Sequence, residues 1–228
     1  MVVSVIGGTG PQGLGIALRL AIEGVEVIVG SRKEEKALEV VAEAKEKYSD
    51  YDLSKMCGMA NEDAAKEGDI LILTVPLAAQ KPTVEGIKEF CTDKIVLDAT
   101  VPLETAIGGK PFRFIDLMEG SAAERTASIL DGTGAKVICA FCNISNSHLS
   151  NIPEDIDCDC LIAGDDKEAK ETAAELINKI PGVRTIDTGI LEKSRIIEKI
   201  TPLLIGLNIK YRSHYGGLRI TGIPKLDE

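Results

Sequence analysis

The 228-residue sequence has only two histidines, no excess of basic residues and no long apolar run. Its 26 lysines and arginines stand against 36 aspartates and glutamates, a formal net charge of −10, which argues against general binding to nucleic acid or anionic membranes. No apolar run approaches the roughly 20 residues that a membrane-spanning helix needs. The N-terminal residues lack the basic flank and cleavage site of a signal peptide, so we expect a cytoplasmic protein.

The six cysteines are few, and two of their spacings superficially suggest zinc: Cys139 with Cys142, and Cys158 with Cys160. A zinc site needs a tight turn that brings both thiolates onto one ion. Residues 137–141 instead have the pattern of a buried strand, whose alternation predicts that Cys139 and Cys142 point to opposite faces. We therefore expect buried or partly buried free thiols, rather than a metal site or a redox pair.

Strand-like and helix-like patterns alternate over roughly the first 140 residues. Short β-branched runs are typical of buried strands, and apolar residues at helical spacing indicate amphipathic helices. Such alternation implies βαβ crossovers and a parallel sheet covered on both faces. The patterns predict strands at residues 2–6, 25–29, 70–75, 95–97 and 136–141, and helices at 12–23, 33–47, 84–90 and 121–130.

The pattern changes beyond residue 141, where a polar, turn-rich stretch at 143–153 suggests a domain junction. We predict an α/β protein, with a doubly wound, parallel-sheet Rossmann domain at residues 1–141 and a smaller α/β domain at 142–228. The second domain should end in a long helix from about residue 191, which Pro202 should kink. Its other predicted elements are strands at 159–163 and 183–187 and a helix at 167–179.

A G-x-G-x-x-G motif at residues 8–13 follows the first predicted strand and opens the first helix. In that context Gly8 permits a tight turn, Gly10 lets a pyrophosphate approach the backbone, and Gly13 lets helix and strand pack closely. The unpaired amides of the helix N-terminus would then face the diphosphate. The motif therefore predicts a dinucleotide site.

The residues after the second predicted strand indicate which dinucleotide binds. An NAD site usually has an acidic residue there, which binds the ribose 2′-hydroxyl, but this chain has Ser31 and Arg32. Arg32 offers a bidentate fork for a phosphate, and Lys36 lies one helical turn further on. These cations could alternatively pair with Glu34, Glu35 and Glu39 on a solvated face, but the pattern favours NADP(H).

The rest of the sequence offers few catalytic groups. His148 lies in the polar junction, where a histidine is more typically solvated than a general acid, and no metal-ligand cluster appears. A carbonyl reductase needs a proton donor, whereas hydride exchange between two cofactors needs mainly shape and alignment. This difference favours transfer between cofactors.

Six segments in order along the chain resemble the NADPH-dependent reductases of the deazaflavin coenzyme F420. They are residues 7–13, 30–32, 74–76, 119–124, 164–166 and 217–222. The resemblance implies reversible hydride transfer between C4 of the nicotinamide of NADP(H) and C5 of F420. The sequence departs from the family pattern at Leu77, where an aromatic residue is common, and at Cys142, where a histidine is common.

The resemblance also implies which residues bind each part of the two cofactors. The implied contacts are Thr9, Gly10, Pro11 and Gln12 for the diphosphate; Ser31, Arg32 and Lys36 for the 2′-phosphate; Val75, Leu77, Ala79 and Val101 for the nicotinamide; and Asn143, Ser145, Asn146, Gly217 and Leu218 for the deazaflavin.

Two other functions stay open on the sequence alone: an NADP-dependent imine or carbonyl reductase, and a non-enzymatic NADPH sensor. Imine reductases with a similar first domain commonly have a longer, all-helical second domain, which this chain lacks. The apolar helix after residue 191 has more apolar surface than a small domain buries, so we expect a homo-oligomer, a dimer or larger.

Overall fold

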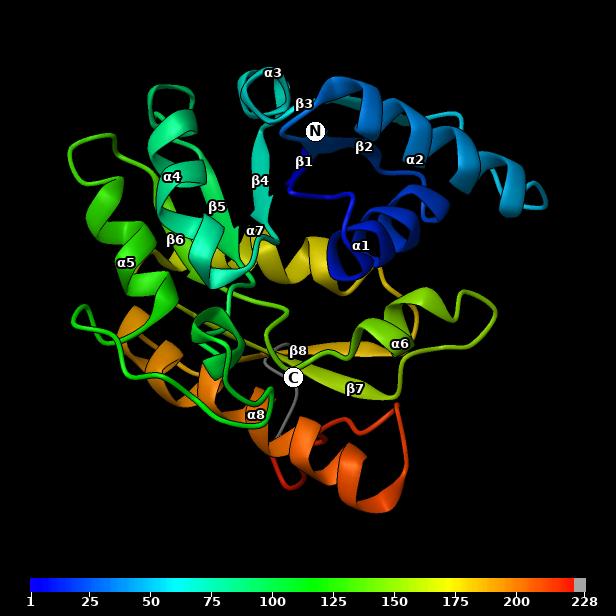
Figure 1. Ribbon diagram of the computed structural model, residues 1–228. Coiled ribbons are helices and arrows are strands. Elements are labelled where there is room, and N and C mark those ends of the chain that lie inside the picture. The colour runs from blue at the N-terminus through cyan, green and yellow to red at the C-terminus, as the bar shows by residue number, and fades with distance from the viewer. Residues whose placement is uncertain (224–228) are drawn as a thin grey trace.

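A computed structural model describes residues 1–223, in which eight strands form one sheet with the order β3-β2-β1-β4-β5-β6-β7-β8 (Figure 1). The strands are β1 (Val2–Ile6), β2 (Glu26–Ser31), β3 (Met56–Ala60), β4 (Ile70–Leu73), β5 (Ile95–Asp98), β6 (Lys136–Cys139), β7 (Cys158–Gly164) and β8 (Val183–Asp187). The α-helices are α1 (Pro11–Ile22), α2 (Glu34–Lys47), α3 (Asn61–Glu67), α4 (Leu77–Ile87), α5 (Ala122–Ile129), α6 (Asn146–Ser150), α7 (Lys167–Ile177) and α8 (Ser194–Tyr211).

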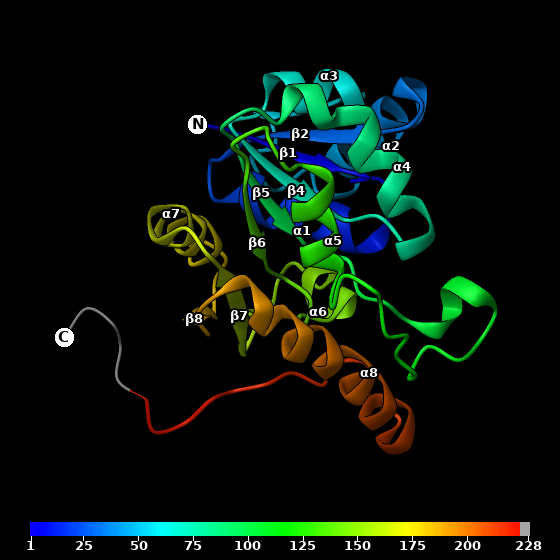
Figure 2. The same ribbon diagram turned by 90° about the vertical axis from the view of Figure 1, so that its left-hand side faces the viewer.

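Helices cover both faces of the sheet, which explains why its central strands are mostly apolar. Buried residues of α1, α2 and α7 pack on one face with Val3 and Val5 of β1, and those of α3, α4, α5 and α8 pack on the other with Ile6. In Figure 2, α8 lies at the opposite end of the molecule from α3. The predicted α/β fold, with a doubly wound parallel sheet and a long C-terminal helix, is confirmed.

The strand directions place a crevice at the carboxyl ends of the central strands. Strands β1 to β6 pair in parallel, and the chain order reverses between β1 and β4. In such sheets ligands bind beyond the carboxyl ends of the strands, at the point where the strand order reverses. The end of β1 is followed directly by the glycine loop, so the fold places that loop at the crevice.

The sheet continues across the predicted domain boundary at residues 141 and 142. Strand β7 joins β6 in the antiparallel direction through two residue pairs, Ile138 with Gly164 and Cys139 with Ala163, and β8 pairs in parallel with β7. The division into domains at residues 1–141 and 142–228 stays a prediction, and its last five residues lie outside the described part of the chain.

The prediction that Cys139 and Cys142 point to opposite faces is wrong. Strand β6 ends at Cys139 rather than at residue 141, and Phe141 takes a left-handed backbone conformation with φ 62°. This turn brings the two sulfur atoms to 3.6 Å from each other. Of the six free cysteines only Cys57 is exposed.

Asp159 of β7 fixes the segment that follows α8. Its buried carboxylate accepts hydrogen bonds from Arg184, from Arg219 and from the backbone amide of Ile220, at distances between 2.7 and 2.9 Å. Burial acts to raise the pKa of Asp159, but these hydrogen bonds outweigh it and lower the pKa to about 2. The residues after α8 are therefore bound back onto the sheet.

Within residues 1–223, no helix combines the length and the apolar character that crossing a membrane requires.

Candidate functional site

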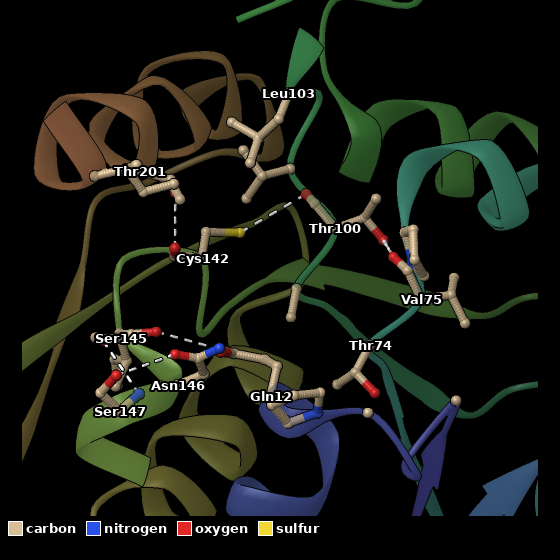
Figure 3. Close-up of a pocket in the computed structure, with 18 of the residues that line it drawn as sticks. Gln12, Thr74, Val75, Thr100, Leu103, Cys142, Ser145, Asn146, Ser147 and Thr201 are labelled. Atoms are coloured by element: carbon tan, nitrogen blue, oxygen red, sulfur yellow. Dashed lines mark hydrogen bonds between the residues drawn. The ribbon is translucent and has the colours of Figure 1, made fainter. Parts of the chain in front are cut away.

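A cavity of about 1300 Å³ opens at the carboxyl edge of the strands. One wall is formed by the loops that follow β1, β2, β4 and β5, the facing wall by α8, and the floor between them by the segment after β6 (Figure 3). Single-ligand pockets typically enclose about 300–1,000 Å³. At about 1300 Å³ the cavity is larger than that range.

The glycine loop has the geometry that its motif predicts. A Cβ atom on Gly8 would lie 2.7 Å from the carbonyl oxygen of Val5, and one on Gly13 would lie 2.7 Å from Cα of Gly8. At Gly10 the nearest such atom is 3.9 Å away, so the backbone there is open to the cavity. Gly10 is also the N-cap of α1 and has no side chain to satisfy the first turn. The loop therefore fits a diphosphate bound against exposed amides.

The basic residues after β2 line the same cavity and differ in their partners. Lys36 forms an ion pair with Glu39 at 2.8 Å, and this hydrogen bond raises the pKa of Lys36. Arg32 and Lys33 take part in none of the ion pairs found within residues 1–223. The alternative that these cations pair with neighbouring glutamates therefore holds for Lys36. The guanidinium of Arg32 has no such partner among the described residues and is available for a phosphate.

The segment after β6 forms the floor between the two walls. Gln12 of α1 donates from its side-chain amide to the carbonyl oxygens of Phe141 and Ile144, at 3.2 and 3.3 Å. The side chain of Asn143 donates to the backbone of Asp159 and accepts from that of Leu161, so it fixes the segment to β7. These bonds hold the floor in a defined position beside the glycine loop.

All but three of the residues implied by the family resemblance line the cavity. Leu77 starts α4 outside it, and Gly217 and Leu218 pack on β7 instead, where the Leu218 carbonyl accepts from the Asp159 amide at 2.7 Å. The lining members are Thr9, Gly10, Pro11, Gln12, Ser31, Arg32, Lys36, Val75, Ala79, Val101, Asn143, Ser145 and Asn146.

The sequence interpretation missed the wall that α8 contributes. Thr201 and Asn208 line the cavity, and the hydroxyl of Thr201 donates to the carbonyl oxygen of Cys142 at 2.7 Å (Figure 3). These two polar residues interrupt the apolar pattern of the helix, and that interruption is the signal from which the wall could have been found. Arg212 and His214, just beyond the helix, line it as well.

Two sets of acid–base candidates, His148 and the pair Tyr51 and Lys55, lie outside the cavity lining, whereas His214 is part of it. His148 does not line the cavity, and its ring stacks on Tyr215 with centroids 5.3 Å apart. Burial lowers the pKa of His148. Tyr51 and Lys55 have the four-residue spacing found in short-chain reductases, but neither lines the cavity. The lining is instead dominated by small, apolar and uncharged polar side chains.

Cys142 lines the cavity, but its thiol is held in the neutral form. The hydrogen bond with Cys139 favours the thiolate of Cys142, yet burial and the nearby carboxylates raise its pKa overall. A thiolate nucleophile needs the opposite shift. Within the described residues, no group of three or more metal-ligating side chains is positioned to hold an ion.

We expect the Cys142→Ala variant to keep most of its activity, because a thiol with a raised pKa supplies neither a nucleophile nor a proton at neutral pH. Steady-state rates of this variant and of Cys158→Ser, a control at a buried thiol outside the cavity lining, measure the effect. Loss of the rate in a folded Cys142→Ala protein, with Cys158→Ser active, would establish a thiol mechanism.

Fold and site together define an α/β protein of the dinucleotide-binding type, with one cavity that extends from the glycine loop to α8. Residues 2–102 match the family model described as NADP oxidoreductase coenzyme F420-dependent. The F420-dependent NADP reductase of Methanothermobacter thermautotrophicus is 52% identical over 225 residues, covering 99% of this chain and 97% of the relative. That of Methanocaldococcus jannaschii is 48% identical over 224 residues, covering 98% and 99%. The chain belongs to the family of F420-dependent NADP reductases.

Solved structures agree in fold. One from Arthrobacter sp. FB24, provisionally assigned as an F420-dependent NADP-reductase, has a TM-score of 0.82 at 22% identity and covers 96% of this chain and 99% of its own. An imine reductase from Streptomyces aurantiacus has a TM-score of 0.59 at 18% identity, and the match covers 91% of this chain and only 61% of that one. The match to the imine reductase therefore leaves a substantial part of that protein uncovered.

Proposed function

We propose that this chain catalyses reversible hydride transfer between the nicotinamide C4 of NADP(H) and C5 of coenzyme F420, in the cytoplasm. The observation that carries the proposal is one continuous cavity, which runs from the glycine loop to α8 and is larger than the pockets that typically hold a drug-sized ligand. Membership of the family, with relatives near 50% identity over almost the whole chain, supports the same activity.

The NADP end of the site fits the residues that line it. Gly10 leaves room for the diphosphate, and Ser31 and Arg32 offer a hydroxyl and an unpaired guanidinium to the 2′-phosphate. Val75, Ala79 and Val101 supply apolar surface beyond the ends of β4 and β5, where the nicotinamide would lie. The hydroxyl of Thr100 donates to the carbonyl oxygen of Val75 at 3.4 Å and so links these two loops (Figure 3).

The deazaflavin end would occupy the space between the floor after β6 and α8. Ser145 and Asn146 face this space, and Leu204 and Ile205 of α8 close it from the other side. One cofactor would supply the hydride and the other would accept it, and the proton that completes reduction of the deazaflavin ring would come from solvent, so the hydride step asks no acid or base of the chain. Its residues would instead align the rings and exclude water between them.

The direct test is to mix the purified protein with F420 and NADPH and to follow the visible absorbance of oxidised F420. We expect bleaching that depends on both cofactors. Consumption of NADPH with a small imine or carbonyl compound, and no bleaching of F420, would support the imine or carbonyl reductase instead. Binding of NADPH with no turnover of any acceptor would support a sensor.

We also propose that the chain forms a homo-oligomer in which a second copy covers the outer face of α8. Ile196, Leu203 and Leu207 on this helix are 63%, 60% and 40% exposed, although they are apolar. A surface of this kind is typical of protein–protein contacts. Light scattering coupled to size exclusion gives the mass in solution, and a monomer at micromolar concentration would contradict the proposal.

A further inference from the structure

The cavity has an unusual charge for so acidic a chain. The sequence has ten more acidic than basic residues, yet none of the described residues that line the cavity is an aspartate or a glutamate. The lining includes the side chains of Arg32, Lys33, Lys36 and Arg212. Such an excess of positive charge in one cavity favours anionic ligands. Arg32, Lys33 and Lys36 follow β2, at the end of the cavity where the NADP 2′-phosphate is proposed to bind, whereas Arg212 belongs to a different part of the chain.

Arg212 lies where α8 ends, on the wall that faces the deazaflavin space. It is the C-cap of α8 and has a left-handed backbone, with φ 53°. The turn after it is held by Asn208, whose backbone carbonyl accepts from the Ser213 amide at 2.9 Å and whose side-chain oxygen accepts from the Gly216 amide at 2.8 Å. These two bonds to Asn208 hold the backbone turn that places Arg212 at the cavity.

The charge of Arg212 is also uncompensated among the described residues. Arg184, Arg195 and Arg219 in the same half of the chain each bind a carboxylate at 2.6 to 2.7 Å. None of the ion pairs within residues 1–223 includes Arg212. Its exposed guanidinium thus remains available to a ligand that enters the cavity from this end.

We propose that Arg212 binds the anionic side chain of the deazaflavin. This inference rests on the proposed function, because it assigns a contact to the second cofactor of the same reaction. The side chain of F420 has a phosphodiester and glutamyl carboxylates, and the planar guanidinium binds both kinds of group with paired hydrogen bonds. Arg212 would thus hold the cofactor by the part remote from the reacting ring, while the residues near Val75 and Ser145 hold the ring.

The test compares Arg212→Ala with wild type on two acceptors: F420, and the deazariboflavin that has the same ring and ribityl chain but no phosphate or glutamate. For F420 we expect KM to rise about tenfold, the effect of losing one charge-assisted hydrogen bond, with kcat nearly unchanged. For the tailless acceptor and for NADPH, KM should stay within about twofold. Arg212→Lys should recover part of the affinity, because it restores the charge without the fork.

Lys210→Ala is the matched control, since it removes one positive charge from the same helix end at a residue that does not line the cavity. Its KM for F420 should equal that of wild type. An unchanged KM for F420 in Arg212→Ala, or an equal rise for the tailless acceptor, would overturn the assignment. If wild type reduced neither acceptor, the proposed function itself would fail. That result is distinct from the two outcomes that would overturn only the assignment of Arg212.

Discussion

Replacement of Arg32 with alanine is expected to raise KM for NADPH about 10- to 100-fold and to leave kinetics with NADH nearly unchanged. The guanidinium lines the cavity beside Ser31, directly after β2, and has no carboxylate partner within the described residues. A charge-assisted, bidentate contact of this type contributes about 1.5–3 kcal/mol, which is the range of the expected change. Steady-state kinetics with both nucleotides measure the effect.

Lys36→Ala is the natural comparison for Arg32→Ala. Lys36 is ion-paired with Glu39 at 2.8 Å and is largely exposed, so removing its charge should raise KM for NADPH less than the loss of Arg32 does. A larger effect at Lys36 than at Arg32 would reverse the assignment of the main phosphate ligand. Equal use of NADH and NADPH by wild type would show that the pocket after β2 does not select the 2′-phosphate at all.

The second large effect concerns Glu198, a fully buried carboxylate that joins α8 to α5. Its two oxygens accept hydrogen bonds from the backbone amides of Ala122 and Ala123, at 2.9 and 3.1 Å. Burial raises the pKa of Glu198 to about 8, although these two bonds act to lower it. The folded protein therefore keeps a proton on this group at pH values where the unfolded chain has released it.

This difference in the pKa of Glu198 between the folded and unfolded chains sets the direction in which stability changes with pH. Stability from the bound proton is fully present below pH 4.5, the ordinary pKa, and is lost as pH rises through about 8. The difference between these two pKa values corresponds to a decrease in the free energy of unfolding of up to about 5 kcal/mol. We expect urea denaturation of wild type at pH 5 to 9 to show this decrease, and Glu198→Gln, which cannot ionise, to show a much flatter curve.

Glu192→Gln is a suitable control, because Glu192 lies six residues before Glu198, just ahead of α8, with its side chain 63% exposed. It should keep the wild-type slope. Asp98 is also buried, and burial raises its pKa as well, so it is the alternative source of such a slope. An undiminished slope in Glu198→Gln would assign the pH dependence to Asp98, and Asp98→Asn would then flatten it.

The parts of the fold that the sequence predicted well are those where a local pattern is sufficient. The β-branched run of β1 and the glycine motif that follows it predicted both the strand and the phosphate loop. Strand β3 was missed because its residues Met56–Ala60 include neither a β-branched nor an aromatic side chain. Its Gly58 packs so closely on α2 that a Cβ atom would lie 2.6 Å from the backbone of Ala37, a requirement visible only in the assembled fold.

The site was predicted in part for the same reason. The residues of the NADP end follow strands directly, so their positions could be inferred from the strand pattern. The α8 wall depends on how a distant helix packs: Thr201 reaches the cavity because it binds the backbone of Cys142, 59 positions earlier. Gly217 and Leu218 were expected in the cavity, but Asp159 binds the adjoining backbone to β7, and no local pattern reveals that bond.

The most direct test of the account is to follow the transferred hydrogen itself. NADPH labelled with deuterium on one face of C4, and then on the other, is oxidised by the protein with F420 as acceptor. Because the proposed mechanism passes the hydride directly between the two rings in one cavity, one of the two labels should appear at C5 of reduced F420 without loss to solvent. Deuterium that is recovered in water before it reaches the acceptor would show that a protein group or solvent carries the hydrogen, and would contradict direct transfer.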